Sequence, residues 1–285
     1  MTTLNNPNKK PKWQRMSVGG YLVLVINTLL SIFPFYWMFI VASNGTDEIS
    51  KIPPTLLPGP RFFTVVNNVY EALPQFNQAL INTFYVGTVV ALAQVFFSAI
   101  AGFAFAKLSF RGQKFMVLFV VLTMMLPSQL GIIPLFMLMG WAGLLDSLGA
   151  LIVPALVTAF GVFWMRQVID AQVPNELLES ASIDGAGVFR AYWSIVLPII
   201  AQSSFVLGLF SFLAVWNDFL WPILVLSSPS NFTAQVAVNQ LKSSYAIDYA
   251  LNMGGAFLST VPLLILFVFV GRRLVRGVMD GAVKG

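Results

Sequence analysis

NELLESASIDGAGVFRAYWSIVLP, residues 175–198, is a polar interruption between two apolar blocks of the chain. It holds three of the eleven acidic residues, whereas a loop that only joined two apolar helices could consist of a few polar residues. The pattern predicts two short amphipathic helices that are separated at Asp184-Gly185. We therefore expect this stretch to bind something that lies outside the apolar blocks.

The first of these helices is predicted over residues 176–183. Asn175 is expected to cap it, because an asparagine side chain can accept a hydrogen bond from a free N–H of the first turn. Glu176 and Glu179 complement the positive end of the helix dipole. Gly185 and Gly187 then allow backbone angles that a helix interior does not offer, which ends the helix.

The second helix is predicted over residues 188–197, directly before Pro198. Its apolar residues recur every three or four positions and form one largely aromatic face, made by Phe189, Tyr192, Trp193 and Val196. Such a face could lie on lipid or bind a protein. A lipid-bound helix usually carries a basic polar face. Arg190 is the only basic residue here, so a protein partner is the favoured interpretation.

The composition of the whole chain is that of an integral membrane protein. Of its 285 residues, 58% are hydrophobic and 9% are charged, and the mean hydropathy is +0.81. Soluble proteins carry about 25% charged residues. A helix of about 20 apolar residues spans a bilayer. We predict an all-α fold with six transmembrane helices, at about 18–42, 78–106, 115–139, 147–166, 201–226 and 251–271.

The predicted six-span domain covers residues 18–271, between a basic tail at 1–17 and a second tail at 272–285. Thirteen of the sixteen lysines and arginines lie in the two tails, the 107–114 loop and the 166–190 segment. Cytoplasmic loops carry an excess of these residues, so both termini and residues 175–198 are expected in the cytoplasm. This alternation explains the net charge of +5 without nucleic acid, and the first tail is expected to contact anionic lipid.

Polar residues inside the apolar blocks are candidates for a substrate pathway, because they are costly in hydrocarbon unless they have partners. Each could instead bond another helix, and the tryptophan could mark the membrane interface. One of these polar residues, Gln129, lies between Pro127 and Pro134, and we expect the two prolines to break the third span there. The candidates are Asn82, Gln129, Trp216, Asn217 and Asp218.

Small residues in the second span predict close helix packing. Ser98, Gly102 and Ala106 recur at every fourth position, which places them on one face of the helix. Such a stripe lets a neighbouring helix approach closely.

Several kinds of chemistry are excluded by the residue inventory. The chain has no histidine and no cysteine, so it cannot form a Ser-His-Asp or Cys-His arrangement, and a zinc site would lack its favoured ligands. The phosphate-binding pattern Gly-x-x-x-x-Gly-Lys-Ser/Thr does not occur. We expect no metal site, no catalytic residue and no cofactor on this chain.

At Glu179-Ser-Ala-Ser-Ile-Asp-Gly-Ala186, followed by Ile195-Val-Leu-Pro198, the chain resembles the cytoplasmic coupling motif of ATP-binding-cassette importer permeases. The motif usually begins Glu-Ala-Ala, and Ser180 replaces its first alanine, a small residue for a small one. Phe33-Pro-Phe-Tyr-Trp37, Val215-Trp-Asn-Asp-Phe219 and the ending Gly281-Ala-Val-Lys-Gly285 extend the likeness over nearly the whole chain. Together they are similar to the shorter six-span subunit of maltose-permease-like carbohydrate importers.

The resemblance implies a permease subunit of an ATP-driven sugar importer in a bacterial or archaeal inner membrane. Its partners would be a second homologous permease, two copies of a cytoplasmic ATPase that uses ATP and Mg, and an extracytoplasmic sugar-binding protein. The resemblance also implies two sets of ATPase contacts. The coupling set is Glu179, Ser180, Ala181, Asp184, Gly185, Ala186, Ile195, Leu197 and Pro198, and the C-terminal set is Gly281, Ala282, Val283, Lys284 and Gly285.

Two other functions are compatible with an apolar chain of this kind. A secondary transporter usually shows inverted repeats and a midplane ion site. No clear repeat is visible here, and one acid within the apolar blocks is thin support for ion coupling. A membrane scaffold would account for the spans but not for the polar residues inside them or for the coupling-like stretch.

Overall fold

The computed structural model describes residues 17–45, 51–241 and 248–282, and the side chains up to residue 271. Within these ranges all regular secondary structure is helical, which confirms the predicted all-α class. The helices are α1 (Val18–Ser43), α3 (Phe62–Ala72), α4 (Phe76–Lys107), α5 (Gln113–Met124), α6 (Ile132–Trp141), α7 (Gly149–Ile152), α8 (Ala159–Gln172), α9 (Asn175–Ile183), α10 (Val188–Ala191), α11 (Leu197–Asn217), α12 (Leu220–Val225), α13 (Ala234–Asn239) and α14 (Tyr249–Ala282).

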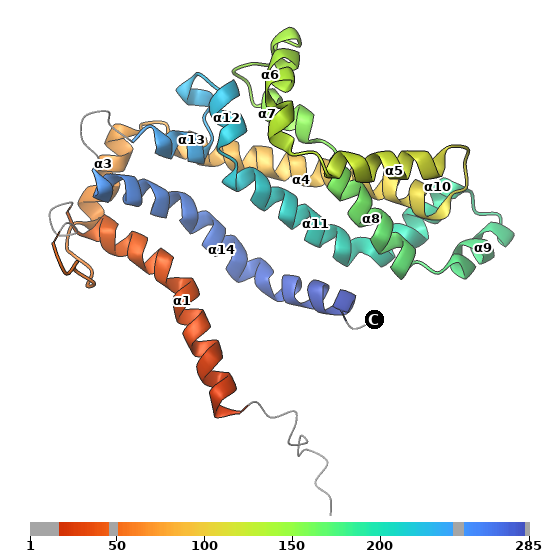
Figure 1. Cartoon of the computed structure of the whole chain (residues 1–285), viewed down its shortest axis with the longest axis horizontal. Helices are drawn as coiled ribbons and strands as arrows, with labels where there is room; N and C mark the ends of the chain where they lie inside the picture. Colours follow the sequence, from red (N-terminus) through yellow and green to blue (C-terminus); the bar gives the residue numbers. More distant parts are fainter. Residues whose placement is uncertain (1–16, 46–50, 242–247, 283–285) are drawn as a thin grey trace, which may run out of the picture.

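Helix α4 is the centre of the packing. Its buried residues, among them Val86, Val90 and Gln94, recur every three or four positions and so lie on one face. This face packs chiefly against α8 and α11, while α14 packs against α1 and α3. Figure 1 shows α4, α11 and α14 lengthwise, with α9 at one end and α3 at the other.

The predicted close packing is found between α4 and α8. A Cβ atom added at Gly102 would lie 2.7 Å from the backbone nitrogen of Arg166. One added at Gly161 would lie 2.5 Å from the hydroxyl of Ser98. The small residues therefore let the two helices approach at backbone distance.

Among the described residues, four helices are long and apolar enough to cross a membrane: Val18–Ser43, Phe76–Lys107, Val188–Asn217 and Tyr249–Gly271. Two bent pairs, Gln113–Met124 with Ser128–Trp141 and Gly149–Ala155 with Ala159–Gln172, would raise the number to six if each is one span. The chain is thus an integral membrane protein by length and composition of its helices. The division into six spans at the expected boundaries stays a prediction.

The third predicted span is broken at Pro127 but not at Pro134. α5 ends at Met124, and the next helical segment is bent away from it by 95°. Pro127 lies in this break, as expected, because it removes a backbone donor. Pro134 does not break the chain, because it is the third residue of α6, where no N–H is needed within the helix.

The helix predicted over residues 188–197 is not separate from the fifth span. α10, a π-helical turn at Tyr192–Val196 and α11 follow one another without interruption, so one helix runs from Val188 to Asn217. Pro198 is accommodated in the first turn of α11, directly after the wider π turn. Residues 188–197 are therefore the first turns of a membrane helix and not a separate element.

Candidate functional site

The first candidate site is the docking stretch, which we define as residues 175–191. α9 ends at Asp184, and Gly185 has a φ of +80°, a left-handed conformation that favours glycine. The N–H of Gly185 donates to the carbonyl of Ser182 at 3.0 Å, and the N–H of Ala186 donates to that of Ala181 at 2.8 Å. This pair of bonds is the glycine-dependent helix ending called the Schellman motif. The glycine thus sets the angle between α9 and α10.

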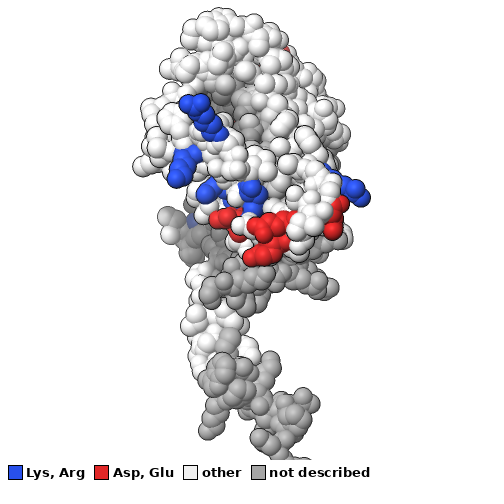
Figure 2. Space-filling model, turned by 90° about the vertical axis from the view of Figure 1, so that its right-hand side faces the viewer, with Lys and Arg blue, Asp and Glu red and all other residues white. Residues whose placement is uncertain are grey.

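Most of the docking stretch is exposed. Ile183 is 87% and Phe189 is 83% exposed. Glu176, Glu179 and Asp184 are exposed beside them. Figure 2 views the molecule from this end, where acidic side chains form one patch with basic ones around it. The surface therefore combines apolar contacts with negative charge.

The aromatic face predicted on residues 189–196 is divided in two. Tyr192 and Val196 are buried in a core cluster, and the ring of Tyr192 lies 5.5 Å from that of Phe103 in α4. Phe189 and Trp193 stay exposed. Half of the face therefore fixes the helix to α4, and the other half is free for a partner or for lipid.

Asn175 does not cap α9. Pro174 occupies the N-cap position, and Asn175 is the first helical residue. Its side-chain oxygen accepts a 2.8 Å hydrogen bond from Nζ of Lys107, the last residue of α4. The sequence contained no signal for this contact, because the two residues lie 68 positions apart.

The second candidate site is a cavity of about 590 Å³ between α4, α6, α11 and α12. This volume is within the range of small-molecule sites, about 300–1,000 Å³. Three of the five predicted pathway residues, Gln129, Asn217 and Asp218, line the cavity together. Its other lining residues are Val86, Gln94, Ser128, Ile132, Leu135, Leu151, Pro154, Ala155, Thr158, Ser211, Ala214, Val215, Leu220, Trp221, Pro222 and Thr233.

Asp218 reaches the cavity because α11 ends one residue before it. Its backbone is extended, with φ of −71° and ψ of 129°, and α12 begins two residues later. The backbone N–H groups of Phe219, Leu220 and Trp221 lie beside its carboxylate. The carboxylate thus lies near the start of α12 and borders the cavity, but the N-cap position of α12 is held by Phe219 without a side-chain cap.

Gln94 organises the wall of the cavity. Its side-chain oxygen accepts hydrogen bonds from the hydroxyls of Ser211 at 2.7 Å and Thr158 at 3.4 Å. Its amide nitrogen donates to the carbonyl of Ala155 at 3.0 Å. One buried side chain therefore joins α4, α11 and the break before α8. The sequence marks Gln94 only as an amide within an apolar block.

Asn82 and Trp216 lie outside the cavity. Asn82 is buried, and its amide donates to the carbonyls of Ser230 at 2.8 Å and Phe232 at 3.0 Å. Trp216 is also buried, and its indole N–H donates to the carbonyl of Ser259 at 3.3 Å. Both side chains hold segments of the chain together. The structure supports the bonding interpretation for Asn82, whereas the buried Trp216 neither lines the cavity nor lies at the surface as an interface marker would.

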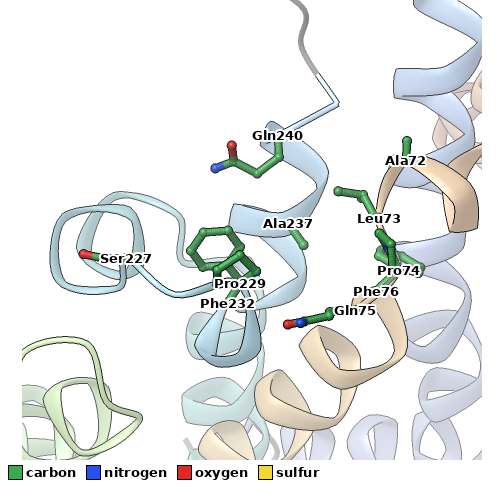
Figure 3. A pocket seen from close by; sticks show the side chains of 10 residues that line it. All are labelled: Ala72, Leu73, Pro74, Gln75, Phe76, Ser227, Pro229, Phe232, Ala237 and Gln240. Atoms are coloured by element: carbon green, nitrogen blue, oxygen red, sulfur yellow. The ribbon is translucent and has the colours of Figure 1, made fainter.

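A further cavity of about 560 Å³ lies at the opposite end from the docking stretch. Figure 3 shows it between the segment around Pro74, before α4, and the segment that contains Phe232 and α13. The glutamine side chains of Gln75 and Gln240 border an otherwise largely apolar lining. This cavity belongs to the loops at the α3 end of the molecule.

Asp146 fastens one of these loops. Its carboxylate accepts hydrogen bonds from the backbone N–H groups of Ser227 and Ser228, both at 2.8 Å, and from the hydroxyl of Ser228. The Ser228 hydroxyl bond, followed by the two backbone bonds, lowers the pKa of Asp146 from 3.8 to about 2. The carboxylate is therefore charged at neutral pH.

Metal binding has no support among the residues that the structure describes. No group of three or more His, Cys, Asp or Glu side chains comes together in these ranges. The C-terminal set of predicted ATPase contacts lies only partly within the described residues. Gly281 and Ala282 end α14 without described side chains, and residues 283–285 lie outside the described residues.

A sequence model of the family described as binding-protein-dependent transport system inner membrane component matches residues 94–279. The chain belongs to this family. The matched region contains the whole docking stretch and every residue that lines the 590 Å³ cavity except Val86. The family expected from the coupling motif is thereby confirmed.

Curated relatives match the permease over nearly its full length. The lactose transport system permease protein LacG of Rhizobium radiobacter is 33% identical, over 93% of this chain and 95% of its own. The sn-glycerol-3-phosphate transport system permease protein UgpE of Yersinia enterocolitica is 31% identical, over 93% and 96%. The arabinooligosaccharides transport system permease protein AraQ of Halalkalibacterium halodurans is 30% identical, over 90% and 92%.

A solved structure has the same fold as the permease. It is described as the crystal structure of a bacterial ABC transporter involved in the import of the acidic polysaccharide alginate. One of its chains matches with a TM-score of 0.77 at 18% identity, over 90% of this chain and 95% of that chain. The likeness establishes that the permease has the fold of an ABC importer chain.

Proposed function

We propose that this permease forms one half of the pathway of an ATP-driven importer for sugars or related polyhydroxylated compounds. The relatives are named for lactose, arabinooligosaccharides and sn-glycerol 3-phosphate, which all carry several hydroxyl groups. The cavity with Gln129, Asn217 and Asp218 is the part of the pathway that this chain supplies. A second, homologous permease supplies the rest.

One observation carries this proposal: a single helix joins the two candidate sites. The helix Val188–Asn217 begins beside the Gly185 turn and ends at Asp218 in the cavity wall. Its 30 residues correspond to about 45 Å at about 1.5 Å per residue. A displacement of the docking stretch is therefore transmitted to the cavity by a rigid element.

The docking stretch is the proposed contact with the ATPase. Glu179, Ser180, Asp184, Gly185 and Ala186 form the part that the ATPase binds, and Ala181, expected in the same set, is buried behind them. Ile195, Leu197 and Pro198 lie on the helix that transmits the motion of this part. The tail 281–285 is proposed as a second contact, and α14 runs toward the α9 end (Figure 1). This end faces the cytoplasm of a bacterial or archaeal cell, in agreement with its share of lysine and arginine.

The proposed mechanism is alternating access. Two ATPase subunits bind ATP with Mg and close, and this closure displaces the docking stretches of both permeases. Each long helix moves as a near-rigid body, so the shared cavity changes from facing the cytoplasm to facing outward. An extracytoplasmic binding protein, which contacts the loops at the α3 end, then releases its sugar into the cavity.

The proposed role of the docking stretch is tested by replacing Gly185, whose left-handed conformation sets the angle between α9 and α10. Nothing lies within 4 Å of a Cβ atom at this position, so the Cβ that Gly185→Val adds has open space around it and the variant tests the left-handed backbone. A left-handed residue with a side chain costs about 1–2 kcal/mol. We expect ATP-driven uptake to fall by about tenfold or more and the ATPase to co-purify poorly, while the permease stays in the membrane.

Gly143 provides a matched control. It also has a positive φ, 67°, and open space around its Cβ position, but it lies between α6 and α7, away from the docking stretch. Gly143→Val should retain ATPase co-purification. Unchanged uptake in Gly185→Val would contradict the docking role. Uptake that persists without the ATPase but stops with a protonophore would indicate a secondary transporter instead.

A further inference from the structure

The 590 Å³ cavity has an unusual balance of charge for a site in a solute pathway. Among the nineteen described residues that line it, Asp218 is the only one with an ionisable side chain. The remaining polar side chains are amides and hydroxyls, and none of the nineteen is a lysine or an arginine. The described lining of this cavity therefore offers no cation to a bound substrate.

Some of these polar groups are already used by the fold. Gln94 has both its oxygen and its nitrogen bonded, and Ser211 donates to Gln94 and also lies 2.9 Å from the carbonyl of Leu207. Thr158 accepts from the N–H of Gly161 at 3.1 Å. These three side chains hold α4, α8 and α11 together and leave little capacity for a ligand.

Other groups keep free capacity. The hydroxyl of Thr233 is buried without any hydrogen-bond partner, although the residue lines the cavity. Such an orphaned group is rare and calls for an explanation such as a ligand. Asn217 donates its amide to the carbonyl of Leu213 at 2.8 Å, which leaves its side-chain oxygen as an acceptor. Together with the Asp218 carboxylate, these groups suit a ligand that donates hydrogen bonds from hydroxyls.

The cavity is unfavourable for an anionic ligand. Phosphate and carboxylate groups are bound by arginine, by lysine or by unpaired backbone N–H groups. The backbone N–H groups of residues 219–221 lie beside the carboxylate of Asp218, so an anion that approached them would also approach this acid. A second negative charge in the cavity would be repelled by the Asp218 carboxylate, and none of the described lining residues is a cation that could stabilise it.

We propose that this cavity binds an uncharged, polyhydroxylated substrate and disfavours phosphorylated or uronic ones. The inference rests on the proposed function and narrows it, because the relatives include a transporter named for an anionic phosphate ester and a structural match described for an acidic polysaccharide. Thr233 and Asp218 are the proposed contacts to the substrate hydroxyls. Trp221, whose indole N–H is fixed by the carbonyl of Ala150 at 2.9 Å, adds an apolar surface beside them.

The substrate test uses the complete importer, with its sister permease, ATPase and binding protein, in liposomes that contain ATP. The neutral probes are lactose, maltotriose and arabinotriose, and the anionic probes are sn-glycerol 3-phosphate and mannuronate trisaccharide. We expect uptake of at least one neutral probe, and uptake of both anions that is slower by about tenfold or more. Uptake of either anion as fast as the best neutral probe would overturn the inference. ATP-dependent uptake of any probe would still support the proposed function, so the two failures are distinguishable.

Two pairs of variants distinguish the substrate preference of the cavity from that of the binding protein. For both pairs, binding of the probes is measured to the importer without its binding protein. Gln129→Lys adds a cation to the cavity wall and should lower the preference for neutral probes by about tenfold, whereas Gln129→Met should not. Thr233→Val should weaken binding of the neutral probe about fivefold, and Thr233→Ser should restore it. An unchanged preference in Gln129→Lys, or unchanged binding in Thr233→Val, would overturn the inference.

Discussion

The Nζ atom of Lys107 donates a 2.8 Å hydrogen bond to the side-chain oxygen of Asn175 and so joins the end of α4 to the first residue of α9. The lysine side chain is only 5% exposed. Asp170, at the end of α8, lies 3.9 Å from the same nitrogen but is 60% exposed, so this ion pair adds little. The lysine therefore ties the docking stretch to the helix at the centre of the fold.

Replacing Lys107 should uncouple ATP hydrolysis from transport. In Lys107→Met the docking stretch loses its bond to α4, so its displacement is transmitted less completely. We expect the number of substrate molecules transported per ATP to fall by about fivefold, while the ATPase still co-purifies. Loss of a hydrogen bond to a charged group costs about 1.5–3 kcal/mol, which the fold should survive. Lys114→Met, at an exposed position near the start of α5, is the control and should keep the wild-type ratio.

Adding one methyl group at Gly102 should destabilise the contact between α4 and α8. The Cβ of Gly102→Ala would lie 2.8 Å from the backbone carbonyl carbon of Met165, and backbone atoms cannot move aside as a flexible side chain can. Overpacking of this kind costs about 1–3 kcal/mol, which should appear as a lower thermal unfolding temperature in detergent.

Gly271→Ala is the control for that experiment, because nothing lies within 4 Å of its Cβ position in α14. Alanine favours a helix interior over glycine by about 0.5–1 kcal/mol, so this variant should be equal to or more stable than the wild type. If Gly102→Ala unfolds at the same temperature as Gly271→Ala, the close approach of α4 and α8 is incorrect.

Removing the amide of Gln94 should weaken the wall of the cavity more than removing one of its partners. Gln94→Leu deprives the carbonyl of Ala155 and the hydroxyl of Thr158 of their bonds, with an expected cost of about 1–3 kcal/mol. Ser211→Ala should cost less, because the remaining bonds of Gln94 persist. Thermal unfolding of both variants tests this order, and the reverse order would show that Gln94 does not organise the wall.

The hydrogen bonds from Ser227 and Ser228 to the Asp146 carboxylate should make the stability of this loop depend on pH within a defined range. The pKa of Asp146 is lowered from 3.8 to about 2, so its contribution to stability is present above pH 3.8 and is lost as the pH falls toward 2. Hydrogen exchange of the Ser227 and Ser228 N–H groups should therefore accelerate between these two pH values, beyond the intrinsic trend. In Asp146→Asn this additional acceleration should be absent. If hydrogen exchange of these N–H groups had the same pH profile in the wild type and the variant, the Asp146 carboxylate would not hold the loop.

Much of this protein is determined by the sequence alone. The long apolar runs dictate a membrane-embedded all-α fold, because a bilayer leaves backbone polar groups no partners except within helices. The 176–183 helix and its end at Gly185 follow from local signals, since a left-handed turn depends on the residue at the turn itself. For the same reason Pro127 could be expected to break a helix.

Contacts between distant segments were decided only by the tertiary structure. Asn82, Gln94 and Asp218 look alike in the sequence, as polar side chains in apolar blocks. The fold gives them different surroundings: Asn82 bonds a loop, Gln94 joins three segments, and Asp218 borders a cavity. A periodic pattern shows which face of a helix is apolar but not which helix covers it, so the polar groups that remain free for a substrate depend on packing.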